Sequence, residues 1–509
     1  MKKFIYFTLL PSLLLFSACG EFLDVNDNPN SPTNVPLEQR LPNALVKSVV
    51  LESGSLNQLG AVWAGYWAKA TDGPGASSLF RLEETYGVEA MSFDRDGRPI
   101  WEDSYTVLVN YKDIEISAQT SGDLAYSGIA KIMQAWHFLR LVDLYNNVPF
   151  SEALQGVKNS TPSYEDGETV YRESIDLITE GINEIKEAPA LSQKPAADDV
   201  MFKGNLELWV KFGNTVKLRA LLRRSELGDN DYISQEIAKI VQEGSGYLSI
   251  GESALVNPGF IATASKQNPF WDTYYRTPTG SATSGFNTLR PTEYIIQQYQ
   301  SLNDPRVETL YAKPETGDDY KGVPLGMTAN TGYTRKETSA LLGPEENNGQ
   351  PAALLKSAEQ PAVLMGSFES LFLQAEAAQR GWITDDAATL YELAISESFE
   401  YMEVEDHLFQ DYYQQEAVLL SGTDQPLQRI IEQKWLALNS INSIEAWNDY
   451  RRLEIPTDLP VSLQSPSQDP NYRPQRLTYR QSELSSNGAE VAKQGHIDPF
   501  ISRVFWDVK

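Results

Sequence analysis

Residues 371–399 have the pattern of two short helices joined by a single turn. Their sequence is LFLQAEAAQRGWITDDAATLYELAISESF. Small residues and one aromatic ring recur at helical spacing on one face of each predicted helix: Ala375 and Ala378 in the first, and Ala387, Tyr391 and Ala394 in the second. A hairpin of this size buries its apolar face only by stacking on a neighbouring hairpin. This stretch therefore predicts a fold built from several helical hairpins.

The turn between the two predicted helices has suitable capping residues. Gly381 stands where the first helix needs a left-handed residue to end. Thr384 is placed to cap the second helix, and Asp385 and Asp386 are favourable at its positive end. Together with Leu371, the small and aromatic positions follow the spacing of one tetratricopeptide repeat. We expect the alanines of this hairpin to be buried and its turn to lie far from any ligand.

Six further stretches have helical periodicity: residues 41–68, 101–116, 125–146, 168–186, 206–226 and 426–452. Residues 125–146 are apolar nearly all round, which predicts a helix in the middle of the assembly. His137 lies within this stretch and has no HExxH-like spacing around it, so we interpret it as an interior residue rather than a metal ligand.

One face of the 206–226 stretch carries cations one turn apart. Lys211, Thr215, Arg219 and Arg223 lie on this face. The cations could form an anion site. Because the chain has a formal net charge of −27, pairing with carboxylates of neighbouring helices is the favoured interpretation.

Between residues 244 and 365 the helical pattern gives way to Gly, Pro, Thr and Asn, apart from a short predicted helix near 292–302. A long irregular insertion on a rigid scaffold is where binding surfaces are usually built. Four aromatic residues stand in a polar part of it, just before a Gly/Ser run: Phe270, Trp271, Tyr274 and Tyr275. We predict ligand contact there, and more weakly at the loop that begins with Tyr320.

Two other aromatic groups have open roles. Trp63 and Trp67 continue the stripe of the 41–68 stretch and suit either core packing or a platform that faces ligand. The chain closes on RVFWDVK, and we expect this tail to dock on the protein through Val504, Phe505, Trp506 and Val508.

The N-terminal sequence predicts the compartment. Residues 1–18 have two lysines followed by a short apolar run, the pattern of a secretory signal peptide. Ser17-Ala18-Cys19-Gly20 resembles the lipobox of bacterial lipoproteins, in which the cysteine is acylated, and Cys19 is the only cysteine. Residues 19–40 are Asn/Pro/Asp-rich and are interpreted as a lipidated tether, followed by a single domain over residues 41–509.

Several classes of function are disfavoured by the sequence. Removal of the signal peptide takes away two lysines and no acids, so the mature charge becomes −29, which argues against nucleic acid. Asp24, Asn26 and Asn28 have the alternate spacing of a calcium loop, but Pro29 replaces its glycine, and we expect no metal site. No GxSxG, P-loop or GxGxxG pattern is present, so we predict a protein that is not an enzyme and needs no cofactor.

Segments spread over the chain, taken together, resemble the SusD/RagB family of outer-membrane nutrient-binding lipoproteins. They are the lipobox with its Asp/Asn/Pro-rich continuation, LVDLYNNVPFSEAL, LWVKFGNTVKLRALLRR, NDPR at 303–306, FLQAEAAQRGW, EQKWLALNSINSIEAWNDYRR and RPQRLTYRQSELSSN. The resemblance implies an all-α fold: a tetratricopeptide-like scaffold of helical hairpins with a large loop-rich ligand-binding portion, here about 244–365.

The same resemblance implies a role. Such a protein captures a glycan, or a similar oligomeric nutrient such as a peptide, and passes it to a TonB-dependent (SusC-like) outer-membrane transporter beneath it. It would be held on the cell surface in the outer membrane through lipid on Cys19. The family has no fixed ligand motif to transfer, so the residues predicted to stack on ligand rest on their aromatic chemistry: Trp63, Trp67, Trp271, Tyr274, Tyr275 and Tyr320. Two alternatives remain, a surface glycoside hydrolase on a helical scaffold and a repeat scaffold that binds only proteins.

Overall fold

The computed structural model describes residues 35–75, 78–91, 99–329 and 331–509. The first half holds α1 Leu37–Leu51, a π-helical turn Glu52–Leu56, α2 Asn57–Trp63, β1 Trp67–Lys69, α3 Arg81–Glu84, α4 Val88–Met91, α5 Ile100–Ser121, α6 Leu124–Tyr145, α7 Gly167–Glu187, α8 Leu206–Arg223 and α9 Asn230–Glu243. The loop-rich part holds β2 Ala254–Val256, α10 Pro269–Tyr274, α11 Ser284–Thr288, β3 Leu289–Pro291, α12 Glu293–Ser301, α13 Arg306–Leu310, β4 Tyr311–Ala312, β5 Ala340–Leu341 and β6 Ala362–Met365. The rest holds α14 Ser367–Gln379, α15 Ala387–Tyr401, α16 Asp406–Tyr413, α17 Pro426–Leu438, α18 Ser443–Leu453, α19 Gln481–Ser486 and α20 Gly488–Lys493.

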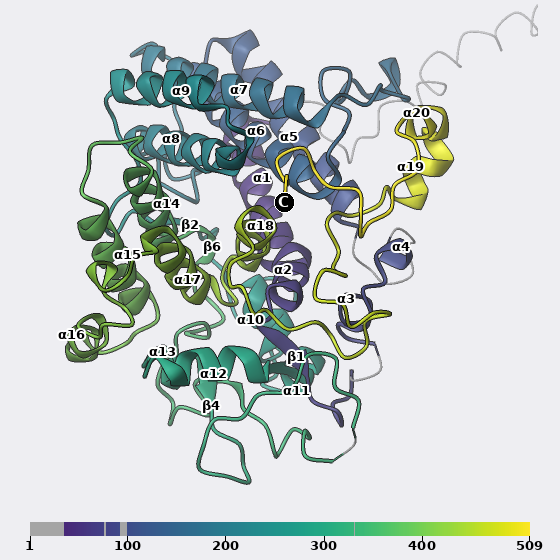
Figure 1. The fold of residues 1–509 in the computed structure, drawn as a ribbon. Helices are drawn as coiled ribbons and strands as arrows, with labels where there is room; N and C mark the ends of the chain where they lie inside the picture. Colours follow the sequence, from purple (N-terminus) through teal and green to yellow (C-terminus); the bar gives the residue numbers. More distant parts are fainter. Residues whose placement is uncertain (1–34, 76–77, 92–98, 330) are drawn as a thin grey trace, which may run out of the picture.

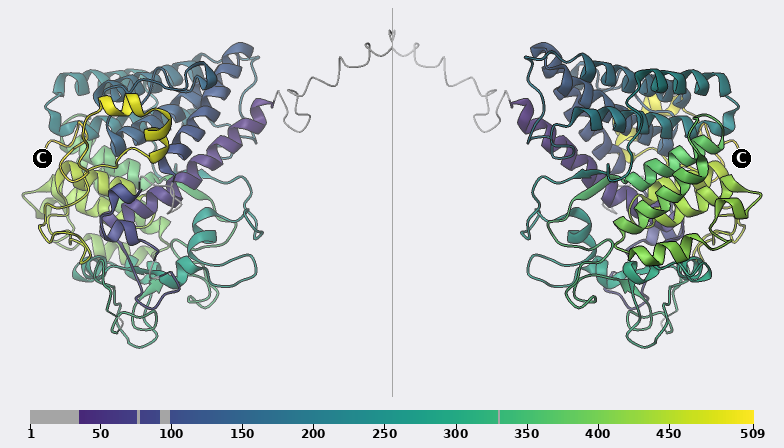
Figure 2. Two further views of the ribbon diagram at one scale, coloured as in Figure 1. Left: turned by 90° about the vertical axis from the view of Figure 1, so that its right-hand side faces the viewer. Right: turned by 90° about the vertical axis from the view of Figure 1, so that its left-hand side faces the viewer.

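The helices form a scaffold at one end of the molecule and the irregular chain gathers at the other. Helices α5 to α9 stack at the top of Figure 1, α14 to α17 lie beside them, and α10 to α13 lie in the loop-rich part at the bottom. Figure 2 shows α1 crossing from the first group toward the loop-rich end. The strands form only short antiparallel pairs, β1 with β3, β2 with β6 and β4 with β5. The predicted all-α fold is confirmed.

Each helix of the scaffold packs on the next through side-by-side contacts. Helix α6 contacts α5 and α7, α7 contacts α8, α8 contacts α14, and α14 contacts both α15 and α17. Helix α18 then joins α17 to α2, so the last helices close back onto the first. This arrangement gives the predicted hairpin the neighbours it needs to bury its apolar face.

Most of the predicted N-terminal region lies outside the described residues. The predicted signal peptide 1–18, Cys19 and tether residues 20–34 lie outside the described residues. Helix α1 already begins at Leu37, so the last part of the predicted tether is helical. The predicted helix 41–68 is broken into α1, the π-helical turn and α2, because Gly54 has non-helical backbone angles and Gly65 adopts a φ of +80°. Trp67 therefore lies on strand β1 and not on the helix.

The hairpin at 371–399 is present as α14 and α15. Gly381 has a φ of +73°, the left-handed conformation expected at the end of the first helix. The predicted cap of the second helix was wrong: Asp386, not Thr384, accepts a hydrogen bond from the N–H of Thr389 at 2.8 Å. Of the five face positions, Ala375, Tyr391 and Ala394 are buried, whereas Ala378 and Ala387 are partly exposed.

Helix α6 is the central helix, as predicted. Every residue from Ala125 to Tyr145 is buried. Its contact with α7 is a backbone contact, because a Cβ atom on Gly128 would lie 2.3 Å from the carbonyl oxygen of Gly181. The absence of a side chain at Gly128 therefore lets the two helices touch.

His137 is an interior residue of α6. Its side chain is fully buried, and its Nε2 atom lies 2.8 Å from the Ser48 hydroxyl oxygen. Burial lowers the pKa of His137 to about 3, and the nearby Arg140 guanidinium acts in the same direction. The imidazole is therefore neutral in the folded protein at physiological pH.

We expect this neutral histidine to make stability depend on pH. In the unfolded chain the imidazole has its ordinary pKa near 6.5 and takes up a proton as the pH falls, whereas the folded protein does not until about pH 3. The contribution is therefore fully present above pH 7 and is lost progressively below pH 6.5, by about 2 kcal/mol at pH 5. Urea unfolding of the wild type and of His137→Gln at pH 7 and pH 5 checks this, and equal losses in both proteins would contradict it.

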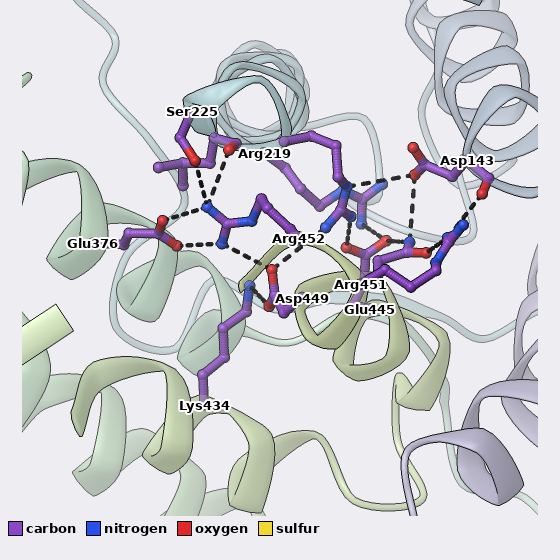
Figure 3. A network of polar contacts seen from close by, with 12 residues as sticks. Asp143, Arg219, Ser225, Glu376, Lys434, Glu445, Asp449, Arg451 and Arg452 are labelled. Atoms are coloured by element: carbon purple, nitrogen blue, oxygen red, sulfur yellow. Dashed lines mark hydrogen bonds and ion pairs between the residues drawn. The ribbon is translucent and has the colours of Figure 1, made fainter. Parts of the chain in front are cut away.

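Arg219 and Arg223 pair with carboxylates from neighbouring helices, as predicted, whereas Lys211 pairs with Glu252 of a loop at 2.8 Å. Figure 3 shows the network between α6, α8, α14, α17 and α18. Glu445 of α18 forms ion pairs with Arg140 and Arg223, and lies 3.6 Å from Arg219. Burial alone would raise the pKa of Glu445, but these guanidinium groups more than offset it and hold the pKa well below its usual value. The carboxylate is therefore ionised and is a hub between three helices.

A second part of the same network surrounds Asp449 and Arg452. The two terminal nitrogens of the Arg452 guanidinium, Nη1 and Nη2, donate to the carboxylate of Glu376 of α14 at 2.5 and 2.8 Å. Nη2 also pairs with Asp449 at 2.9 Å. Lys434 of α17 forms a further ion pair with Asp449 at 2.8 Å. These buried contacts fix how α14, α17 and α18 sit against each other.

The C-terminal tail docks on this network. The indole Nε1 of Trp506 donates a hydrogen bond to Asp143 of α6 at 2.9 Å. Val504 and Trp506 are buried and Phe505 is partly buried, as expected, whereas Val508 is exposed. Among the described helices, none combines the length and apolar character needed to span a bilayer.

Candidate ligand-binding site

Phe270, Trp271 and Tyr274 lie on a short helix and not in a loop, and Tyr275 directly follows this helix. Helix α10 begins there because the Asn268 side chain accepts hydrogen bonds from the N–H groups of Phe270 and Trp271, both at 3.0 Å, and Pro269 fits the first helical position. The helix has two faces with different roles. Phe270 and Tyr274 point into the core, whereas Trp271 is partly exposed.

The inward face of α10 is locked to the helical scaffold. The ring of Tyr274 packs edge-on against Trp67 at 4.9 Å, and its hydroxyl donates to Gln58 of α2 at 2.9 Å. The Trp67 indole in turn donates to the hydroxyl of Ser440 at 2.7 Å. Trp67 and Tyr274 therefore set the position of α10 and have no exposed ring face.

Trp63 is also a core residue. It packs against Trp447 of α18 with ring centroids 4.8 Å apart, and its indole donates to the carbonyl oxygen of Glu83 at 3.1 Å. Of the two interpretations of the Trp63 and Trp67 stripe, the structure favours core packing, because only 5% and 0% of these residues are exposed.

The outward side of α10 carries a cluster of aromatic and charged residues. We call it the Trp271 cluster; its members are Trp271, Tyr275, Arg276, Phe286, Glu345 and Glu346. Tyr275 is at its centre, with its ring 4.6 Å from Trp271 and 5.2 Å from Phe286. The Arg276 guanidinium lies over the rings of Tyr275 and Phe286, at 4.4 and 4.5 Å.

The two glutamates of the Trp271 cluster reach it from a distant loop. Arg276 forms ion pairs with Glu345 at 2.7 Å and Glu346 at 2.9 Å. The Tyr275 hydroxyl donates to Glu346 at 2.9 Å and accepts from the N–H of Glu345 at 2.8 Å. This close approach requires Gly343, because a Cβ atom there would lie 2.3 Å from the Tyr275 ring.

The electrostatics of the cluster suit binding rather than proton transfer. Hydrogen bonds from Arg276 lower the pKa of Glu345, whose side chain is 61% exposed, so this carboxylate is an acceptor at neutral pH. A general acid needs the opposite shift. The Nη1 atom of Arg276 is buried and has no hydrogen-bond partner in the part of the chain that the structure describes.

The sequence-predicted residues thus fall into two groups. Trp63, Trp67 and Tyr274 are in the core, and Tyr275 is 1% exposed and supports the cluster from below. Trp271 is the sequence-predicted residue of the cluster whose ring is partly exposed. Tyr320 is partly exposed on a separate loop, with Lys313 Nζ 5.4 Å from its ring. Ligand contact at Trp271 and Tyr320 stays a prediction.

Four members of the cluster were not singled out from the sequence: Arg276, Phe286, Glu345 and Glu346. Arg276 directly follows the aromatic run, which is a usable signal. The glutamates are about seventy residues away in the sequence, and only the fold brings them to the cluster. Among the described residues, no group of His, Cys, Asp and Glu side chains could hold a metal ion.

Comparison with known proteins assigns the family. The family model described as "Starch-binding associating with outer membrane" matches residues 41–480. The chain belongs to the SusD-like family. The family resemblance seen in the sequence is therefore confirmed. No curated protein sequence gives a significant match.

Solved SusD-like structures have the same fold over nearly the whole chain. A SusD homologue from Bacteroides uniformis is 20% identical, with a TM-score of 0.72, and the match covers 94% of this chain and 100% of that one. A SusD/RagB family protein from Bacteroides thetaiotaomicron is 18% identical, with a TM-score of 0.74, over 93% and 99% of the two chains. A SusD homologue from Flavobacterium johnsoniae, described as chitin-binding, is 23% identical, with a TM-score of 0.72, over 92% and 99%.

Proposed function

We propose that this SusD-like protein is a lipoprotein of the outer-membrane surface that captures a glycan at the Trp271 cluster and delivers it to a TonB-dependent transporter. The family match over residues 41–480 carries the proposal. The description of the Flavobacterium relative as chitin-binding supports a glycan as ligand. The lipobox-like sequence before Gly20 supports anchoring through Cys19.

The chemistry of the Trp271 cluster supports the same proposal. The C–H face of a sugar ring lies well on an indole or phenol plane, and the neighbouring carboxylates and guanidinium can bind sugar hydroxyls. Trp271 provides the ring, Glu345 provides exposed acceptor oxygens, and Arg276 holds Glu345 in place. A glycoside hydrolase would need a second, protonated carboxyl group facing Glu345. Glu346, its neighbour in the cluster, is bound to the same Arg276.

Replacement of Trp271 tests the proposal. We expect Trp271→Ala to weaken glycan binding by about 1–3 kcal/mol, because one stacking surface is lost, with thermal stability nearly unchanged. Isothermal titration calorimetry on a soluble form without residues 1–19 measures this, starting with chito-oligosaccharides and continuing with ligands found on a glycan array. The matched control is Trp382→Ala, because Trp382 is also partly buried but lies in the turn between α14 and α15.

Each alternative function predicts a different outcome. Unchanged affinity in Trp271→Ala would remove the cluster from the site, and hydrolysis of a bound glycan would favour the glycoside hydrolase. Absence of glycan and peptide binding in both forms would favour a scaffold that binds only proteins. Delivery to a transporter is tested separately by purification from native membranes, where we expect a large outer-membrane barrel to accompany the protein.

A further inference from the structure

A cationic hollow lies at the C-terminal end of α18, away from the residues of the Trp271 cluster. It has a volume of about 210 Å³ and is bounded by the end of α18, the segment 470–475 and the C-terminal tail. Four cationic residues line it: Arg451, Arg473, Arg503 and Lys509. Glu454 also lines the hollow and carries a carboxylate. No described cation lies within 4.0 Å of this carboxylate as an ion-pair partner. This concentration of positive charge stands out in a chain whose net charge is −27.

Arg473 is a buried guanidinium that forms no ion pair with a carboxylate of the described residues. Its Nε and Nη1 atoms donate to the carbonyl oxygens of Pro470 and Pro460, both at 2.9 Å, and Nη2 donates to that of Leu459. A guanidinium has five N–H donors, so two remain after these three bonds. The three carbonyl oxygens hold the group in place but do not neutralise its charge.

Arg451 is placed in a similar way. It is 3% exposed, and its guanidinium lies 3.6 Å from the centroid of the Trp447 ring and 4.7 Å from that of Trp506. Its Nη1 and Nη2 atoms donate to the carbonyl oxygens of Gln475 and Asp143, at 2.7 and 2.8 Å, and Nη2 also donates to the side-chain oxygen of Asn448. Its Nε atom has no hydrogen-bond partner among the described residues. Burial lowers the pKa of Arg451 to about 9, although the carboxylates of Asp507 and Asp143 act in the opposite direction.

Six other buried arginines of the described chain differ in this respect, whereas Arg290 and Arg476 are also buried without an ion pair to a described carboxylate. Ion pairs within 4.0 Å join a carboxylate to each of Arg140, Arg219, Arg223, Arg224, Arg306 and Arg452. A buried charge without such a partner is costly in free energy, and a bound anion reduces that cost. Arg503 and Lys509 add accessible positive charge at the rim of the hollow. Arg503 also forms an ion pair with Asp507 at 2.6 Å.

We infer that this hollow is a second binding site, for the carboxylate or sulfate group of a small acidic ligand such as a uronic acid. Arginine forks match the paired oxygens of such groups, and the aromatic ring of Tyr450 lines the same hollow beside them. The volume suits a ligand of about one sugar unit. This inference does not depend on glycan binding at the Trp271 cluster. An experiment can therefore contradict one site and leave the other unaffected.

Calorimetry with sodium glucuronate, sodium sulfate and glucose tests the inference on the soluble form without residues 1–19. We expect glucuronate to bind and glucose, which has no charge, not to bind at this site. Asn471→Asp is the sharpest variant, because Asn471 is exposed at the hollow and its side chain makes no hydrogen bond in the described structure. The added carboxylate should weaken glucuronate binding about tenfold or more. Lys509→Gln should weaken it less.

Lys493→Gln is the matched control, because Lys493 is an exposed lysine of α20 that does not line the hollow. Binding of sulfate as well as glucuronate supports a general oxyanion site, and binding of glucuronate alone supports an acidic-sugar site. Absence of both, or equal weakening by Asn471→Asp, Lys509→Gln and Lys493→Gln, would overturn the inference. Trp271→Ala should leave glucuronate binding at the hollow unchanged, which separates the two sites.

Discussion

Replacement of Glu445 by glutamine is expected to lower the free energy of unfolding by about 3–5 kcal/mol. The side chain keeps its shape but loses its charge, so the buried guanidiniums of Arg140 and Arg223 lose the carboxylate that both contact. A buried charge without a counter-charge lowers the free energy of unfolding by more than the intact ion pair adds to it. Urea unfolding followed by circular dichroism at pH 7 measures the effect.

Glu180→Gln is the control for this variant. Glu180 also pairs with a cation, Lys131, at 3.0 Å, but its side chain is 61% exposed and solvent screens the pair. We expect a loss of no more than about 1 kcal/mol. If both variants lose the same small amount of stability, the network around Glu445 does not hold the helices together.

Gly128→Ala is expected to destabilise the protein by about 3 kcal/mol, at the upper end of the usual range for overpacking. The new Cβ atom would lie 2.3 Å from the carbonyl oxygen of Gly181 and 2.7 Å from Cγ1 of Ile185. Helix α7 must move away, because a backbone oxygen cannot rotate aside as a flexible side chain can. Thermal and urea unfolding measure the loss.

Gly488→Ala is the matched control, because Gly488 is also helical and has no atom within 4 Å of the added Cβ. Alanine favours a helix over glycine, so this variant should be neutral or slightly more stable. A Gly128→Ala protein as stable as Gly488→Ala would show that α6 and α7 separate at little cost.

The helical scaffold could be predicted from the sequence because its signals are local. Apolar residues at three- and four-residue steps and the left-handed position of Gly381 predicted helices that the structure contains. The ends of helices were less predictable. Thr384 and Asp386 are both good caps, and the choice between them depends on how the turn packs.

The candidate site was predictable only in part. The run from Phe270 to Tyr275 was found, because aromatic residues in a polar segment are unusual. The sequence does not indicate which of these rings face outward. In the structure, α10 buries Phe270 and Tyr274 against Trp67 and leaves Trp271 partly exposed. The positions of Glu345 and Glu346 depend on a loop that approaches Tyr275 through Gly343.

The sequence by itself determined the helical hairpins, the family and the pairing of the cations on α8, because periodicity, capping and an excess of acids are properties of neighbouring residues and of composition. The tertiary structure decided which aromatic residues are core and which buried cations have no carboxylate partner. Those features depend on segments far apart in the chain, such as those that carry Arg276 and Glu345, which form an ion pair, or Arg451, Arg473 and Lys509, which line the same hollow. Burial and charge balance arise only when such segments meet.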